Sequence, residues 1–113
     1  MKSNAAPALE RGLFVRFAES DPEAADRRAT WIEAHKLHLR QSDKDGFRIL
    51  LSGPTQPGDD GNAAALVIGE APSMSVFADF SERDPFVVHG IYNRIRLLRW
   101  TPTLVAVPGF AVY

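Results

Sequence analysis

The sequence predicts an α+β fold in which two helices cover one face of a four-stranded antiparallel sheet. Its 113 residues fit a single domain, and 45% hydrophobic with 24% charged residues is ordinary for a globular protein. Strand-like runs are interleaved with two helix-like runs in the order βαββαβ. That order is the split βαβ, or ferredoxin-like, arrangement, so we expect one sandwich of sheet and helices.

The first strand and the first helix open this pattern. Residues 12–19 alternate as a strand does, with Leu13, Val15 and Phe17 on one face and Phe14, Arg16 and Ala18 on the other. The next four residues, Ser-Asp-Pro-Glu at 20–23, combine a capping residue, an early proline and an acidic first turn. We therefore predict a helix over residues 22–41.

Two strands and the loop that joins them follow. An aromatic and branched run at 47–52 predicts the second strand, and the Gly-Pro pair at 53–54 is expected to end it. Proline, glycine and aspartate dominate residues 55–62, which predicts an exposed loop. The third strand is expected at residues 64–70.

The last part of the pattern contains a helix, a helical turn and a strand. Ser73 can cap a second helix that ends near Arg83. A short helical turn is expected at residues 85–89, closed by Gly90. The fourth strand is expected at residues 91–100, which are rich in isoleucine, leucine and aromatic side chains.

The second and third strands are apolar on both faces. In the second strand Phe47, Ile49 and Leu51 face away from Leu50, and the third strand repeats this pattern. Two-sided strands of this kind are expected where neither face of a sheet meets water. Because the helices cover only one face, we predict a sheet-to-sheet homodimer, a dimeric α+β barrel.

The domain boundaries follow from composition. We expect a flexible N-terminus at residues 1–10 and a single folded domain at residues 11–100. The remaining residues, 101–113, are apolar and contain prolines, so they predict an extension that packs on the domain or on a partner subunit.

Composition also limits the function. The 13 basic and 14 acidic residues balance, and no aromatic motif of an RNA-binding sheet is present, so nucleic acid is not an expected partner. No apolar run approaches a membrane span or the core of a signal peptide, which predicts a cytoplasmic protein without a membrane partner. With no cysteine, thiolate chemistry is excluded, and we expect no cofactor.

The first predicted helix carries a stripe of residues that share one face, and His35 lies in its middle. The stripe is formed by Arg28, Trp31, Ile32, His35, His38 and Leu39. From the pattern alone, a core histidine with satisfied nitrogens is the more common arrangement. The alternative is proton transfer by His35, with a carboxylate that fixes its tautomer.

Asp84 is the candidate carboxylate. Its ordinary role is to cap the short helical turn that begins with Pro85. In the predicted topology, however, the first helix and this turn lie on the same side of the sheet, so contact with His35 is allowed. A metal site at His35, His38 and His89 is a weaker hypothesis because nothing fixes a third ligand, and we predict no metal.

The order of several short motifs resembles the YciI-like (YCII-related) family. Arg28, the run EAHKLHLR around His35, a glycine turn, LLSGP and DPFVVHGIY follow the order and spacing of that family from about Leu13 to Trp100. The resemblance implies a catalytic pair of His35 and Asp84 beside a cavity. It also implies an orienting role for Arg28, while Trp31 and His38 are further candidates for substrate binding.

Two functions therefore stay open. One is a small cofactor-independent enzyme that transfers a proton in an isomerase or lyase reaction on a small cyclic or aromatic-derived compound. The other is a noncatalytic module that binds a small ligand or another protein. Fold-level analogy favours the enzyme without deciding between the two.

Overall fold

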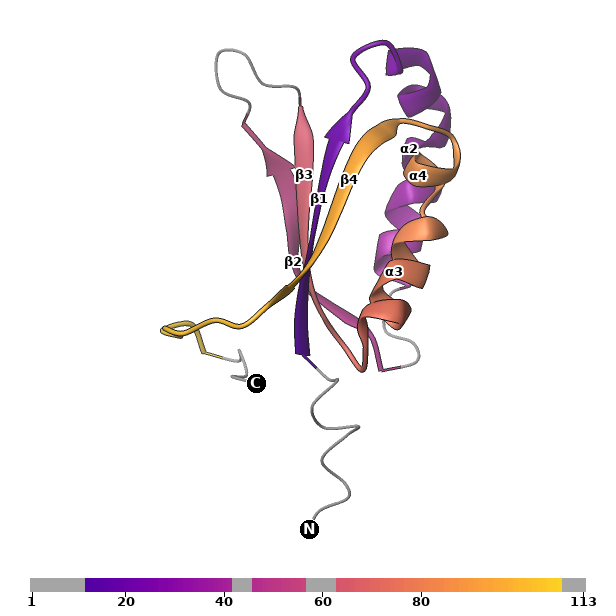
Figure 1. Ribbon diagram of the computed structural model, residues 1–113. Helices are drawn as coiled ribbons and strands as arrows, with labels where there is room; N and C mark the ends of the chain where they lie inside the picture. The colour runs from indigo at the N-terminus through magenta and orange to yellow at the C-terminus, as the bar shows by residue number, and fades with distance from the viewer. Residues whose placement is uncertain (1–11, 42–45, 57–62, 109–113) are drawn as a thin grey trace.

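A computed structural model describes residues 12–41, 46–56 and 63–108, and it confirms the predicted fold. The elements are β1 (Gly12–Ser20), α2 (Ala25–Arg40), β2 (Arg48–Thr55), β3 (Ala64–Ala71), α3 (Met74–Glu82), α4 (Pro85–Val88) and β4 (Tyr92–Trp100). The four strands form one antiparallel sheet in the order β2-β3-β1-β4. All three helices lie on the same side of this sheet (Figure 1).

Strand β1 lies at the centre of the sheet and pairs with β3 and β4. Directly opposed residues share a face of the sheet. Arg16 of β1 stands opposite Val67 of β3 and Leu97 of β4, on the face that the helices cover. An arginine therefore occupies the middle of the covered face.

Strand β2 is longer than predicted. It continues through Gly53 and Pro54 to Thr55, whereas the Gly-Pro pair was expected to end it. The reason is its place at the edge of the sheet, where a proline costs no ladder hydrogen bond on the open side. A register shift between Ile49 and Leu51 marks an irregularity in its pairing with β3.

Helix α2 begins later than predicted, at Ala25, and no side chain caps it. The Asp21 carboxylate instead accepts a hydrogen bond from the Glu23 N–H at 2.9 Å, and the Asp21 carbonyl accepts one from the Ala24 N–H at 3.0 Å. These bonds make a separate turn between β1 and α2. The Ser-Asp-Pro-Glu residues at 20–23 were predicted to start the helix, but they form this turn, and the helix begins after it at Ala25.

The caps predicted for the later helices are present. Ser73 caps α3 by accepting a hydrogen bond from the Val76 N–H, and Asp84 caps α4 by accepting one from the Phe86 N–H at 2.9 Å. Gly90 ends α4 with a φ of 71°, a backbone conformation that favours glycine. Asp84 is therefore fixed in place by the backbone of α4.

The core between helices and sheet has two parts. One cluster contains Phe14, Phe47, Val67, Ala71, Phe77 and Phe80, and the other contains Ala18, Ala24, Phe86, Ile91 and Tyr92. Phe14 and Ala18 belong to different clusters, and Arg16 lies between them on β1. The buried arginine thus marks the boundary between the two parts of the core.

The other face of the sheet has no cover within the described part of the chain (Figure 1). Leu51, Leu98 and Trp100 are 54%, 45% and 42% exposed. In the C-terminal extension, Pro102 is buried while Leu104 is 87% exposed. The predicted flexible segment at residues 1–10 lies outside the described residues, as do residues 109–113 of the extension.

None of the described helices has the length and apolar character needed to cross a membrane.

Candidate functional site

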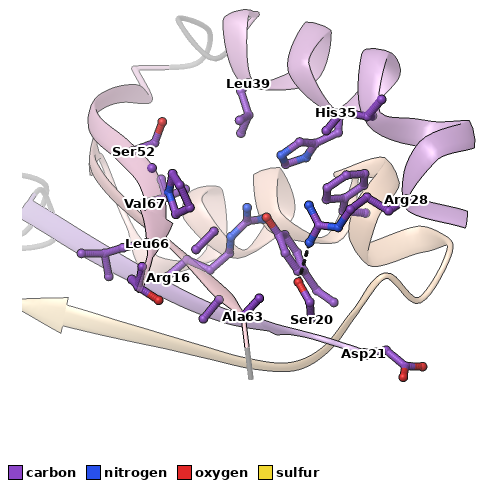
Figure 2. Close-up of a pocket in the computed structure, with 18 of the residues that line it drawn as sticks. Arg16, Ser20, Asp21, Arg28, His35, Leu39, Ser52, Ala63, Leu66 and Val67 are labelled. Atoms are coloured by element: carbon purple, nitrogen blue, oxygen red, sulfur yellow. Dashed lines mark hydrogen bonds between the residues drawn. The ribbon is translucent and has the colours of Figure 1, made fainter. Parts of the chain in front are cut away.

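A cavity of about 510 Å³ lies between α2 and the sheet (Figure 2). Helix α2 contributes Arg28, Ile32, His35 and Leu39 to its wall, and β1 contributes Arg16 and Ser20. Residues of β2 and β3 form the opposite wall, and Phe86 and Tyr92 complete it. Cavities that bind small molecules commonly measure about 300–1,000 Å³, so this one is large enough for a small ring compound.

His35 and Asp84 are in contact at this cavity. The His35 Nδ1 atom lies 2.7 Å from Asp84 Oδ1, and both side chains are buried. Because an ionised carboxylate only accepts hydrogen bonds, Nδ1 carries the proton of this bond. The other ring nitrogen, Nε2, then has a free lone pair when the ring is neutral, and the ring points into the cavity (Figure 2).

The imidazole is also fixed by packing. Its ring stacks on Phe86 with centroids 3.9 Å apart and an interplanar angle of 1°, and it meets the edge of Tyr92 at 5.9 Å. Phe86 follows Asp84 by two residues, so the same short helix supplies both the carboxylate and the stacking ring. His35 is therefore held in one orientation before any ligand binds.

Asp84 is ionised at neutral pH although it is fully buried. Burial by itself raises the pKa of Asp84, but the hydrogen bond from His35, the charge of Arg16 and the Phe86 N–H together lower this pKa below its usual value of 3.8. The Arg16 Nη1 atom lies 3.0 Å from Asp84 Oδ2, an ion pair without hydrogen-bond geometry. Asp84 thus holds His35 through one oxygen and faces Arg16 with the other.

Arg28 and Tyr92 supply further polar groups to the cavity. Arg28 donates a hydrogen bond to the Ser20 hydroxyl, drawn as a dashed line in Figure 2, and its guanidinium lies 4.9 Å from the centre of the Phe86 ring. Burial is the largest influence on Tyr92 and raises its pKa above 10.0. Tyr92 is therefore a neutral phenol at pH 7.

Trp31 and His38 lie on the predicted stripe of α2 but outside the cavity wall. The Trp31 ring stacks on His89 at 3.7 Å. The His38 Nε2 atom lies 2.8 Å from the Phe80 carbonyl oxygen, and its ring stacks on Phe80. Both side chains hold α2 against the neighbouring helices, so their predicted contact with substrate has no support in the cavity geometry.

The hypothesis of a metal site at His35, His38 and His89 has no support in the positions of these side chains. Among the described residues, no group of three or more histidine, aspartate or glutamate side chains is placed to hold a metal ion. His35 bonds to Asp84, whereas His38 and His89 stack on Phe80 and Trp31. The three histidines are thus used in separate contacts.

Residues 12–101 match the family model of the YCII-related domain. The chain belongs to this family. Protein YciI of Escherichia coli O6:H1 and that of Shigella flexneri are each 27% identical to it over 89 residues, which cover 74% of this chain and 90% of either relative. The resemblance inferred from the motif order is confirmed.

Two solved structures extend this comparison. The 5-chloro-2-hydroxyhydroquinone dehydrochlorinase TftG of Burkholderia phenoliruptrix, in complex with 2,5-dihydroxybenzoquinone, is 26% identical, with a TM-score of 0.64 over 79% of this chain and 93% of that one. SnoaB of Streptomyces nogalater, a cofactor-independent oxygenase, is 11% identical, with a TM-score of 0.50 over 86% of this chain and 97% of that one. The second likeness shows the fold alone.

The family motifs meet at the cavity. Ser52, Gly53 and Pro54 line it from β2, and Tyr92 lines it at the start of β4. Asp84, which begins the DPFVVHGIY motif, bonds to His35 of the EAHKLHLR motif beside them. The motifs are far apart in the sequence, yet the fold brings residues of all three to the same cavity from opposite sides.

Arg16 is the residue of the site that the sequence interpretation missed. Its alternation placed it on the same face as Phe14 and Ala18, which are both buried. A charged residue between two buried apolar positions was the available signal, because a buried charge requires a partner. The pattern could not show that the partner is Asp84.

Proposed function

We propose that this protein is a cofactor-independent enzyme that moves a proton on a small cyclic compound, with His35 as the acid and base. The observation that carries this proposal is the 2.7 Å contact between His35 Nδ1 and Asp84 Oδ1 beside a 510 Å³ cavity. A histidine oriented by a carboxylate is a common arrangement for proton transfer near neutral pH. Asp84 orients the ring and balances the charge that His35 gains.

The proposed step uses only groups of this chain and the bound compound. Nε2 of His35 takes a proton from carbon or oxygen of the ligand, and the electron pair of the broken bond enters the ring. In an elimination, a leaving group on a neighbouring carbon departs with its bonding pair. In an isomerisation, Nε2 returns the proton to a different atom, so no oxidant or cofactor is consumed.

The comparison with TftG supports the choice of substrate class. TftG is a dehydrochlorinase, and the compound bound to it is a six-membered ring with two hydroxyl groups. Loss of hydrogen chloride from a ring begins with or includes removal of a proton, which is the step proposed for His35. The size of the cavity and its mixture of aromatic and polar walls suit a compound of this kind.

A panel of chlorinated hydroquinones, hydroxyquinones and unsaturated lactones tests the proposal. Chloride release and exchange of ring hydrogen for deuterium would be measured for wild type, His35→Gln and His38→Gln. We expect His35→Gln to lower kcat by about 10²–10⁴-fold, the usual contribution of a general acid or base. His38 lies outside the cavity, so His38→Gln is expected to keep its activity if it remains folded.

Equal activity of wild type and His35→Gln would contradict the proposal. A panel in which several compounds bind and none is converted would favour the noncatalytic ligand-binding module. In that case the stacked and hydrogen-bonded His35 would serve to shape the cavity.

We also propose that a second copy covers the open face of the sheet. Val15, Leu66, Ile68, Leu98 and Trp100 line a hollow on this face, and Glu19 stands opposite Arg94 at its margin. Four strands of eight or nine residues present about 500 Å² in projection, which is of the same order as the roughly 800 Å² of accessible surface that each partner buries in a standard interface. An apolar centre with a charged margin is typical of such interfaces.

A further inference from the structure

Arg16 is the largest side chain among those that are almost completely buried. It is 1% exposed and comes from the central strand of the sheet. A buried arginine is rare unless its donors are paired. Replacing buried ion pairs by apolar side chains is often neutral or stabilising, so stability alone does not explain why a charge divides this core.

Most of the donors of Arg16 have no partner. Its Nη1 atom lies 3.0 Å from Asp84 Oδ2 and 3.5 Å from the Ser81 hydroxyl, at the outer limit of a hydrogen bond. Its Nε and Nη2 atoms are buried and have no hydrogen-bond partner among the described residues. A guanidinium has five N–H donors, and leaving buried donors unpaired is costly.

These unpaired donors belong to a residue of the cavity wall. Arg16 lines the same cavity as His35, and Figure 2 shows its side chain extending from β1 into the space below the His35 ring. The rings of Tyr92 and Phe80 lie 5.2 and 5.7 Å from the guanidinium carbon. Both rings restrict the guanidinium, so its free donors are oriented in advance.

The charges of the cavity wall do not balance. Arg16 and Arg28 contribute two positive charges, and Asp84, in contact with Arg16, contributes one negative charge. No carboxylate among the described residues pairs with Arg28, which is bonded to the neutral Ser20 hydroxyl. The remaining charged residues of the wall, Asp21 and Lys36, are paired with Arg27 and Glu33. With His35 neutral, one positive charge is left over.

We propose that Arg16 is a ligand-binding residue that receives an ionised oxygen of a small planar organic anion, a phenolate, an enolate or a carboxylate. This inference rests on the proposed function and adds the charge of its substrate. A flat guanidinium with two free N–H directions matches such an oxygen in geometry and charge. When Nε2 of His35 removes a proton from the ligand, the negative charge that develops on the ring oxygen stays next to Arg16.

The experiment compares charged and neutral ligands of one shape. 2,5-Dihydroxybenzoquinone, which is an anion at neutral pH, and its uncharged dimethoxy analogue would be titrated calorimetrically into wild type, Arg16→Met, Arg16→Lys and Arg83→Met. Arg83 is exposed, pairs with Asp79 and does not line the cavity, so Arg83→Met controls for the loss of a positive charge. 2-Hydroxybenzoate serves as a second anionic probe.

We expect wild type and Arg83→Met to bind the anions at least about tenfold more tightly than the dimethoxy compound, because a hydrogen bond to a charged group is stronger than one to a neutral group. This preference should disappear in Arg16→Met and return in part in Arg16→Lys. If Arg16→Met does not fold, Arg28→Met takes its place, because Arg28 is the other arginine of the cavity wall. An anion preference that survives in Arg28→Met then supports Arg16, and one that disappears overturns the inference. Equal binding of charged and neutral probes by wild type, or no binding of either anion at millimolar concentration, overturns the inference.

Failure of this inference and failure of the proposed function give different results. A His35→Gln variant that keeps the anion preference but loses turnover supports both. Anion preference that depends on Arg16, in a protein that converts no panel compound, supports the inference and contradicts the enzyme. If turnover requires His35 but the protein shows no preference for anions, the result supports the enzyme and contradicts the inference about Arg16.

Discussion

One carboxylate connects the stability of the fold to the candidate site. Asp84 Oδ1 accepts hydrogen bonds from His35 and from the Phe86 N–H, and Oδ2 faces Arg16. The first contact belongs to the site, the second caps α4, and the third balances a buried charge. Removing the charge of Asp84 therefore affects the candidate site, a helix end and the core together.

The lowered pKa of Asp84 predicts how stability depends on pH. In the unfolded chain the group titrates near 3.8, and in the folded protein it titrates lower, so its contribution is complete above about pH 4 and is lost as pH falls through the folded value. Urea unfolding of wild type, measured between about pH 7 and pH 2.5, should show this decrease in the free energy of unfolding at acid pH.

The matched variants are Asp84→Asn and Asp79→Asn. Asp79 is an exposed partner of Arg83, so the stability of Asp79→Asn should fall at acid pH nearly as much as that of wild type. Asp84→Asn should show a smaller decrease in the free energy of unfolding at acid pH than wild type. At neutral pH it should lower the free energy of unfolding by about 3–5 kcal/mol, because Arg16 loses its counter-charge. An unchanged pH profile in Asp84→Asn would show that this carboxylate is not coupled to folding.

The sequence predicted part of the site for identifiable reasons. Helical periodicity placed His35 among apolar neighbours, and it is buried in the structure. The contact with Asp84 spans 49 positions, and periodicity carries no information on such a separation. The predicted topology allowed that contact, and the resemblance to the family implied the pair. Arg16 was missed because strand alternation assigns a face without showing whether a cavity lies over it.

At the scale of elements, one glycine allows the sheet and the helices to approach closely. Gly69 of β3 is buried, and a Cβ atom added there would lie 2.8 Å from Cε1 of Phe47 and 3.1 Å from Cε1 of Phe77. Both rings belong to the first core cluster, where Phe77 also stacks on Phe14 at 5.5 Å. Their positions are set by several neighbours, so neither ring can move alone.

Gly69→Ala should therefore destabilise the protein by about 1–3 kcal/mol, the usual cost of overpacking a core. Gly53→Ala is the control, since it is also in a strand and a Cβ atom there would meet nothing within 4 Å. We expect Gly53→Ala to change the free energy of unfolding by less than about 0.5 kcal/mol, with any change towards greater stability because alanine is favoured over glycine in a strand. Similar unfolding midpoints for the two variants would contradict the packing argument.

The order of the elements was predictable, whereas two of their limits were not. Alternation and capping residues gave all seven elements because each depends on neighbouring residues. The extension of β2 through Pro54 depends on its place at the edge of the sheet, and the late start of α2 depends on the turn made by Asp21. Both are consequences of tertiary structure, so a local pattern could not show them.

At the scale of the whole molecule, the apolar sheet face opposite the helices is left without a cover by the described part of the chain. Its most exposed apolar side chains, Leu51, Leu98 and Trp100, lie on the edge strands β2 and β4. The described part of the C-terminal extension adds exposed Leu104 and Val107 close to the end of β4. An exposed apolar patch of this scale is often an interaction surface. The extension can add to the interface by packing on the second copy, which agrees with its prolines and its apolar composition.

The oligomeric state tests this arrangement. Leu98 lies on the open face opposite Val15 of β1, and Leu98→Glu would place two charges near the centre of a two-fold interface. We expect wild type to sediment as a dimer at micromolar concentration and Leu98→Glu to sediment as a monomer. Leu37→Glu is the control, because Leu37 is similarly exposed but lies on α2, on the other side of the sheet, so this variant should stay dimeric. A monomeric wild type would exclude the second copy as the cover, and a dimeric Leu98→Glu protein would place the interface elsewhere on the molecule.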